Sequence, residues 1–580
     1  MATWLMHPDA LTIVETLFGA SVLTSFVCFL TDSYLHKVIR TNWKPLLVSI
    51  ALVLIWRIPT DGKFFHGTEY EDSYVYTVAG RQLAGHFQIE PSGATLPYSI
   101  NVCAVGSLAS CRKSENYPEH LIGYPYILSV FIKLLGYRPS IGSIVNVVCA
   151  CLADILIFLV CIVISEDVIA AGSAALIFAI TPIFAVWGLE TSAEPISNGC
   201  ISLVLWFCLR YVAVSPERSS HWRTFVMWCA LTSTLMFSLT VKRENILLPI
   251  VLPLVVLYLR FTRKDTRPFA IRRPWWFLLS ATLAILFSFQ LHLSQTQNSE
   301  IELLKKFPLT VAELIHFFPV FISSFLNVQW YGGAAILVLA GIVVASSRKH
   351  LGLVPLALFA GYVLLYAFHL RSYYEMQSGT TDSRAALRFS MSLMSMWSIL
   401  AGIGTEFVFG WFKHTSAYKN HNTVFKWVAG FLVMAIAGVS YFTTLYFRED
   451  VVEDEFRVRV EPSVAAVQTA SSIGVHKTYI ITLEPLILQM YAEPTVNLIS
   501  LHDLNDAVIG EIGFDRGMSD LLYLDEQIYR NPVDAERYKS QLTCLNQFKR
   551  STLADESTYS VIRLSKVTAD EPHTQSSNRR

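Results

Sequence analysis

Long apolar runs separated by short polar segments occupy most of the chain between residues 11 and 447. Many of these runs hold about 18–22 residues, enough for a helix to cross a bilayer core of roughly 30 Å. We predict about twelve spans, near residues 11–30, 44–58, 141–164, 168–187, 195–213, 224–241, 246–260, 274–293, 328–346, 352–369, 387–410 and 427–447. The pattern therefore predicts an α-helical polytopic membrane protein with about 12 transmembrane helices.

Basic residues between the spans predict the orientation in the membrane. They are Lys37, Arg40 and Lys44; Arg210, Arg218 and Arg223; Arg260, Arg263, Lys264, Arg267, Arg272 and Arg273; Arg348 and Lys349; and Lys413, Lys419 and Lys426. All of these groups fall on the cytoplasmic side if both termini lie outside the cytoplasm. The acidic loop Ser165–Asp167 is discordant, but orientation follows Lys and Arg and depends little on acids.

Two segments between the spans, and the tail, are too polar to cross the membrane. The segment 59–140 is predicted to be a large outer loop. Within it, the apolar run 121–132 is too short to cross the membrane and indicates an interfacial or re-entrant helix. The segment 294–327 contains a second candidate surface helix, Leu314 to Leu326. These segments complete a predicted transmembrane domain over residues 1–447.

The tail after residue 447 has a different composition. Strand-like runs at 478–483, 495–500 and 558–564 alternate with helical patterns near 484–492 and 531–544. This alternation predicts a small extracytoplasmic α/β domain over residues 448–570, large enough to bury its own core, with a disordered end at 571–580.

Composition agrees with the membrane assignment. The chain is 53% hydrophobic and 16% charged, whereas an average soluble domain is about 25% charged. Met1 to Glu15 contains no Lys or Arg, so we expect no cleavable signal peptide. Cys103 and Cys111 lie in the first outer loop, where a disulfide and two free thiols both remain open.

An acidic pair, Glu71 and Asp72, follows closely on the second apolar run. Carboxylates at a membrane edge need to face water, a partner or a substrate. Adjacent acids point in different directions, so we expect one to act as a general base while the other orients it or is solvated. An ordinary solvated start of a loop is the alternative. Tyr76 and Arg81 follow at spacings compatible with a short surface helix.

Cations and acids recur at other predicted outer ends. His120 follows Glu119 and could meet a lipid phosphate, or could be satisfied by Glu119 and water. Glu194 precedes Pro195, which suits the start of a helix, where a carboxylate is favourable. Glu190 has no such structural explanation and could simply be solvated.

Two further pairs oppose the positive-inside trend. Lys242 and Arg243 are predicted outside, so they either bind a phosphate or are neutralised by Glu244. Arg384 and Arg388 stand at the outer start of the eleventh span and suggest an anionic ligand, with snorkelling to the interface as the alternative.

Together these clusters resemble the GT-C superfamily of membrane glycosyltransferases, and within it the bacterial relatives of the protein O-mannosyltransferases and the lipid A aminoarabinose transferases. The resemblance covers roughly residues 59–400. It lies in Asp72 with Tyr76, Arg81 and Leu83-Ala84-Gly85; Glu119 to Tyr124; Gly136 and Asn146; Glu194-Pro195; Lys242-Arg243; and Arg388-Phe389. The chain departs from the family pattern at His120, where lysine is usual, and in an extra N-terminal span.

The resemblance implies inverting transfer of one sugar from a polyprenyl-phosphate donor to a hydroxyl acceptor on the extracytoplasmic side of a bacterial inner (plasma) membrane. Asp72 would be the base and Glu71 its neighbour. Residues implied in substrate or phosphate binding are His120, Tyr124, Lys242, Arg243, Arg388, Tyr76, Arg81 and Glu194. The acceptor stays open between protein, lipid A and an envelope glycan.

The implied partners are the lipid-linked donor, the acceptor and membrane lipids, with no nucleic acid. We expect no cofactor and no bound metal, the alternative being a divalent cation held by Glu194 or Glu190. Two rival functions remain. A transporter or flippase for a lipid-linked saccharide would place charges near mid-bilayer, where Asp154 is the clearest acid. A non-catalytic envelope-assembly subunit would use the tail as its interaction module.

Overall fold

The computed structural model divides the chain into two compact units. One comprises Met1–Gly67 and Pro118–Glu449, and the other Thr68–Tyr117 and Asp450–Arg580. The structure describes residues 8–57, 71–84, 121, 123–188, 191–213, 221–262, 274–295, 311–347, 350–376, 389–413, 435–446, 460–473, 477–482, 488, 491, 496–501, 519–526, 539–556 and 559–566.

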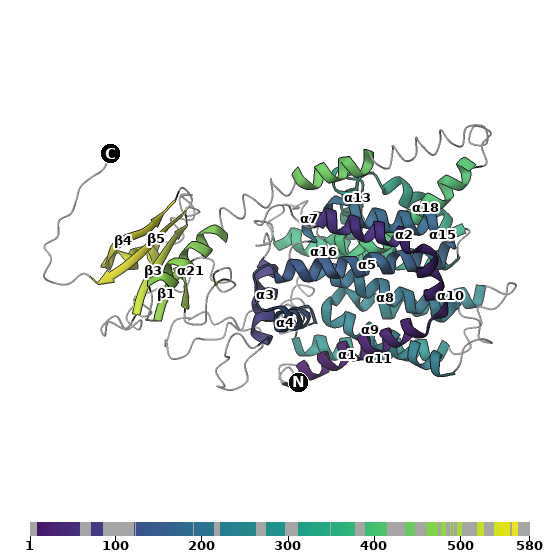
Figure 1. Ribbon diagram of the computed structural model, residues 1–580, viewed down its shortest axis with the longest axis horizontal. Coiled ribbons are helices and arrows are strands. Elements are labelled where there is room, and N and C mark those ends of the chain that lie inside the picture. Colours follow the sequence, from purple (N-terminus) through teal and green to yellow (C-terminus); the bar gives the residue numbers. More distant parts are fainter. Residues whose placement is uncertain are drawn as a thin grey trace. The chain divides into compact units, whose positions relative to one another are not determined.

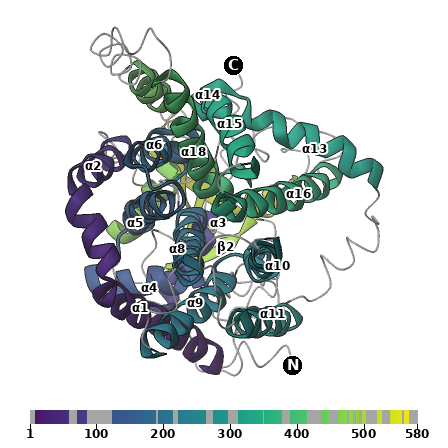
Figure 2. The same cartoon turned by 90° about the vertical axis from the view of Figure 1, so that its right-hand side faces the viewer.

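The first unit is a bundle of helices (Figures 1 and 2). Its described elements are α1 (Pro8–Thr31), α2 (Ser33–Arg57), α4 (Gly123–Leu135), α5 (Ile141–Ser165), α6 (Val168–Ile180), α7 (Pro182–Trp187), α8 (Glu194–Ala213), α9 (His221–Val241), η2 (Arg243–Ile246), α10 (Leu247–Thr262), α11 (Pro274–Gln295), α13 (Val311–Phe325), α14 (Val328–Tyr331), α15 (Ala335–Ser347), η3 (His350–Gly352), α16 (Leu353–Met376), η4 (Met391–Leu393) and α18 (Met394–Lys413). The predicted class, a polytopic helical membrane protein, is confirmed.

Five of the described helices are long and apolar enough to cross a membrane: Ile13–Thr31, Ser33–Arg57, Ile141–Ser165, Thr224–Val241 and Met391–Trp411. Shorter apolar helices accompany them, so the number of twelve stays a prediction. Burial separates inner from outer helices. Only 22% of the α1 window is buried, against 72% of the windows in α9 and α18. Viewed along the bundle in Figure 2, α5 and α8 lie inside and α1 and α2 outside.

The first turn between helices is much tighter than the sequence suggested. We expected Lys37, Arg40 and Lys44 to fill a loop, but they lie on α2. The correction follows from Asp32, whose Oδ1 accepts hydrogen bonds from the backbone N–H groups of Tyr34 (3.0 Å) and Leu35 (3.4 Å). This cap satisfies donors that a helix start leaves open, so α2 begins directly after α1.

Two predicted spans are broken. The expected span at 168–187 divides into α6 and α7 at Thr181 and Pro182, since proline cannot continue the hydrogen-bond ladder. The buried guanidinium of Arg57 donates to the carbonyls of Phe178 (3.3 Å) and Ala179 (3.1 Å), which end α6. The span at 328–346 divides into α14 and α15, where Gly332 and Gly333 have φ of 59° and 75°.

Helix α4 is the apolar run that was expected not to span. Its 13 residues extend for only about 20 Å, short of a bilayer core of roughly 30 Å. Figure 2 shows it running across the bundle, at a steep angle to helices that are seen end-on. Its first residue, Gly123, packs so closely on Thr240 that a Cβ would lie 2.5 Å from the Oγ1 atom. The start of α4 is therefore fixed beside the end of α9.

The second unit contains helix α3 (Glu71–Leu83) and the small C-terminal α/β domain that the sequence predicted. Strands β1 (Lys477–Thr482), β2 (Val496–Ser500), β3 (Ser519–Glu526), β4 (Phe548–Asp555) and β5 (Tyr559–Lys566) form a sheet in the order β2-β1-β3-β5-β4. Strand β1 pairs in parallel with β2 and β3, while β5 is antiparallel to β3 and β4. The helices α21 (Glu461–Ile473) and α25 (Lys539–Cys544) and the 3-10 turn η9 (Leu545–Gln547) complete its described elements.

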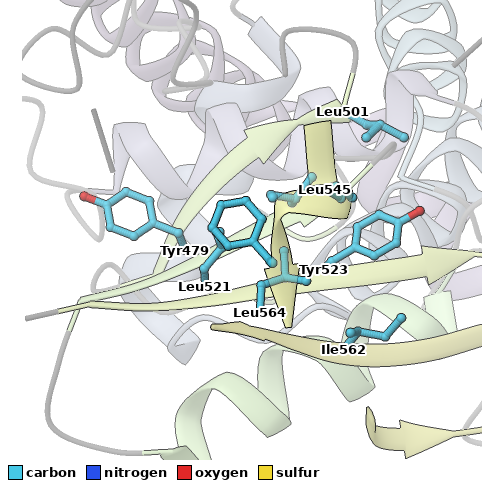
Figure 3. Close-up of a cluster of buried hydrophobic side chains, with 9 residues drawn as sticks. Tyr479, Leu501, Leu521, Tyr523, Leu545, Ile562 and Leu564 are labelled. Atoms are coloured by element: carbon cyan, nitrogen blue, oxygen red, sulfur yellow. The ribbon is translucent and has the colours of Figure 1, made fainter. Parts of the chain in front are cut away.

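Both faces of this sheet are covered. Ala466 and Ala470 of α21 pack with Ile480, Leu522 and Val561. The alternate residues of the same strands form a second cluster with Leu545, shown in Figure 3, in which Tyr479, Leu521 and Leu564 converge. Strands β3 and β4 were not predicted from the sequence. The predicted domain boundaries are not tested by these elements and stay predictions.

A buried ion pair joins the start of α2 to the last turn of α8. Arg210 donates from Nε and Nη2 to the two carboxylate oxygens of Asp32 at 3.1 and 3.0 Å, and its guanidinium lies 4.3 Å from the ring centroid of Tyr34. We expect Asp32→Ala to lower the free energy of unfolding by about 3 kcal/mol, because it leaves a buried cation without its anion. The double variant Asp32→Ala/Arg210→Met should lose less unfolding free energy than Asp32→Ala alone. Unfolding in mixed micelles measures both, and a larger loss in the double variant would contradict the reasoning.

Helices α15 and α18 touch through their backbones. A Cβ on Gly404 would lie 1.9 Å from the carbonyl oxygen of Leu337, and one on Gly341 equally close to that of Leu400. We expect Gly404→Ala to lower the free energy of unfolding by about 1–3 kcal/mol, because the added methyl group overpacks the contact. Gly410 on the same helix has nothing within 4 Å of its Cβ position, so Gly410→Ala is the control and should be neutral or stabilising in the same unfolding measurement. Equal losses in both variants would rule out the close contact.

Candidate functional site

The helical unit brings one cation and its acceptors together where several helices begin or end. Lys242 stands between α9 and η2, Glu194 is the first residue of α8, and Ser392 lies in η4 just before α18. The Lys242 ammonium donates to Glu194 Oε1 at 2.9 Å and to Ser392 Oγ at 2.6 Å. The side chains of Lys242 and Glu194 are only 11% and 7% exposed. The site is thus a nearly buried, charge-assisted hydrogen-bond cluster.

The local fold explains why Lys242 reaches this position. Helix α9 ends at Val241, and Lys242 adopts an extended conformation, with φ of −148° and ψ of 131°, before the 3-10 turn. Its own N–H still donates to the carbonyl of Ser238 at 3.1 Å, and its carbonyl accepts from the N–H of Asn245 at 3.2 Å. Both backbone groups of Lys242 are therefore satisfied while its side chain leaves the helix axis.

Aromatic rings form another side of the cluster. The Lys242 ammonium lies 5.7 Å from the ring centroid of Tyr366, on α16. That ring stacks on Phe389 with centroids 5.5 Å apart and planes 15° apart. A cation over an aromatic face is attracted by the quadrupole of the ring, more strongly where water is scarce. The ammonium is thus held by a carboxylate, a hydroxyl and a ring.

The structure brings Lys242 and Glu194 together, as two predicted site residues. Lys242 forms an ion pair with Glu194. The alternative that Glu244 neutralises the Lys242-Arg243 pair stays a prediction. Glu194 opens α8 before Pro195, as its sequence context indicated. Arg243 follows on η2 and is half-buried.

Tyr124, predicted to bind substrate or phosphate, lies inside the bundle. It is fully buried, and its hydroxyl donates to Asn146 Oδ1 of α5 at 2.7 Å. This bond ties α4 to α5 inside the bundle. A contact of Tyr124 with substrate stays a prediction.

The predicted base lies on α3 in the second unit. This helix begins at Glu71 and carries Asp72, Tyr76 and Arg81. Tyr76 and Arg81 are buried, whereas the side chains of Glu71 and Asp72 lie outside the described part. The remaining predicted positions His120, Arg388, Arg384, Glu190, Cys103 and Cys111 also lie outside the described residues.

Metal binding has little support from the donor set at this cluster. Within the described part of the chain, no three His, Cys, Asp or Glu side chains gather closely enough to hold a metal ion. Glu194, the acid considered as a ligand, binds the Lys242 ammonium. The expectation of no cofactor remains a prediction.

Several residues of the cluster were missed in the sequence. Ser392, Tyr366 and Asn198 lie within apolar runs and match none of the motifs, whereas Asn245 directly follows Lys242, Arg243 and Glu244 but was given no role. For Asn198 a signal existed, because an amide within a membrane span needs hydrogen-bond partners on other helices. Which partners it finds depends on how the helices pack, and the sequence does not show that.

No protein-family model matches the chain, and no curated protein sequence matches it either. Among solved structures it is similar to ArnT from Cupriavidus metallidurans bound to undecaprenyl phosphate, with a TM-score of 0.55 and 12% identity over 90% of this chain and 98% of that one. The apo state of the same protein gives a TM-score of 0.54 and 13% identity with the same coverage. At this identity the likeness establishes the fold alone, and it is the fold that the resemblance implied.

Proposed function

We propose that the protein is an integral-membrane inverting glycosyltransferase, which moves a sugar from a polyprenyl-phosphate donor to a hydroxyl acceptor outside the cytoplasm. The observation that carries this proposal is the nearly buried Lys242 ammonium, held by Glu194 and Ser392 at one end of a GT-C bundle. A cation fixed at a helix junction is suited to a phosphate group. The similar ArnT structure was solved with undecaprenyl phosphate, which supports a lipid phosphate as the ligand.

The proposed reaction uses this cation on the leaving group. The acceptor oxygen attacks C1 of the sugar, and the bond from C1 to the phosphate oxygen breaks with its electron pair leaving on the polyprenyl phosphate. Negative charge grows on that phosphate in the transition state, and the Lys242 ammonium stabilises this charge. Further predicted donors are Arg243, Arg388 and His120. Asp72 takes the proton of the acceptor hydroxyl, and attack from the opposite face inverts C1.

We propose the extracytoplasmic side for the site end of the bundle, from the positive-inside distribution of Lys and Arg. The bacterial inner membrane is what the resemblance implies. The rival transporter needs a mid-membrane charge, for which Asp154 was the candidate. That carboxyl is fully buried and hydrogen-bonded to Ser49 of α2. A bond between α2 and α5 is a tether within the bundle, and it gives no specific support to transport.

Removal of the cation tests lipid-phosphate binding. We expect Lys242→Met to weaken the binding of undecaprenyl phosphate at least about tenfold, because a charge-assisted contact contributes roughly 1.5–3 kcal/mol. The measurement is the Kd for purified protein in nanodiscs. Lys44→Met, which removes an exposed lysine from α2, is the matched control and should bind as the wild type does. Unchanged affinity in Lys242→Met would remove Lys242 from the site.

Removal of the base tests the chemistry. We expect Asp72→Asn to reduce the release of free polyprenyl phosphate from a polyprenyl-phosphate sugar by about 10²–10⁴-fold, since the amide cannot accept the proton. Glu69→Gln, three residues away, should retain turnover. Wild-type turnover by Asp72→Asn would disprove the assignment of this base, while an enzyme with no turnover in any form would argue for the rival functions.

A further inference from the structure

A buried asparagine, Asn198, connects the two groups that hold Lys242. It lies in the second turn of α8 and is fully buried. Its Nδ2 donates to the carbonyls of Glu194 (3.0 Å) and Met391 (2.9 Å). Its Oδ1 accepts from the backbone N–H (2.9 Å) and the hydroxyl (2.8 Å) of Ser395. All four hydrogen-bonding positions of the amide are in use.

These contacts determine the spacing around the lysine. Glu194 is itself one acceptor of the Lys242 ammonium, and Met391 directly precedes Ser392, the other acceptor. Ser395 lies in the first turn of α18, so its two bonds to the Asn198 amide join α8 to the start of that helix. One amide thus fixes how far the start of α8 lies from the start of α18.

A second asparagine, Asn245, holds the backbone that carries Lys242. Its Oδ1 accepts from Ser197 Oγ of α8 (3.1 Å) and Tyr362 OH of α16 (2.8 Å). Its Nδ2 donates to the Ser238 carbonyl of α9 (2.9 Å). Asn245 is fully buried. The turn between α9 and α10 is therefore fastened to three helices, and its partner on α8 is the residue next to Asn198.

We propose that Asn198 and Asn245 are positioning residues, which fix the Lys242 ammonium so that a lipid phosphate meets a preformed cation. This inference rests on the proposed function. A free lysine side chain samples many rotamers. A ligand that orders this side chain binds more weakly, because the loss of rotamer entropy is subtracted from the binding free energy. A frame built by two satisfied amides orders the lysine during folding, before the ligand arrives. Aspartate could not replace either amide, because it lacks the donors.

The test compares Asn198→Ala with Ser202→Ala. Ser202 is equally buried, lies one turn further along α8, and is bonded to the same Ser395, at 3.0 Å. We expect Asn198→Ala to weaken undecaprenyl phosphate binding in nanodiscs on the order of tenfold, as outer-shell supports of bound ions do. Acetylation of Lys242 by acetic anhydride, followed by mass spectrometry, should become several-fold faster as the ammonium loosens. Ser202→Ala should lower the melting temperature but change neither readout.

A milder variant covers the case in which Asn198→Ala does not fold. Tyr362→Phe removes only the hydroxyl that donates to Asn245, and should shift affinity and Lys242 acetylation in the same directions, by about twofold. Asn198→Asp should behave like Asn198→Ala.

The outcomes separate the two proposals. Wild-type protein that does not bind undecaprenyl phosphate contradicts the proposed function, while the acetylation rates still test the frame. If the wild type binds, and Asn198→Ala or Tyr362→Phe changes neither affinity nor acetylation, the positioning role is overturned. Equal effects of Ser202→Ala and Asn198→Ala on both readouts would also overturn it, since they would show a general loss of packing.

Discussion

The geometry of the helical unit depends on the need to satisfy a cation that is largely out of water. A charge in a poorly solvated interior is tolerated only where ionic and polar partners surround it. Lys242 finds them on α8, η4 and α16, elements far apart in the sequence. These contacts require the end of α9, the start of α8 and the turn η4 to meet beside the middle of α16. Asn198 and Asn245 then supply the hydrogen bonds that hold those ends in register.

Much of the fold could be predicted because it follows from local patterns. Apolar runs long enough to cross a bilayer mark most of the helices, and β-branched runs mark β1, β2 and β5. The errors arose where a single side chain overrides the pattern. Asp32 starts α2 early by capping it, Pro182 divides a span, and Gly332 with Gly333 divides another.

The candidate site was predictable only as a set of unusual charges. Lys242 and Glu194 stood out because charges at the ends of apolar runs need a reason. The sequence did not show that these two residues pair, because the pairing depends on how α8 and α9 pack rather than on proximity in the chain. Glu244, two residues from Lys242, was the obvious neighbour, yet the carboxylate that reaches the ammonium is 48 positions away. The partners of an ion in a helical bundle are chosen by tertiary contacts.

Helix α8 carries a buried ion pair at each end. Glu194, in its first turn, is paired with Lys242, and Arg210, in its last, with Asp32. The sixteen residue steps from Glu194 to Arg210 correspond to about 24 Å of helix. An acid at the start with a base at the end also complements the helix dipole. Sliding of α8 along its own axis would stretch both pairs at once. The depth of the Lys242 cluster in the bundle is therefore fixed in part by Arg210, at the opposite end of the same helix.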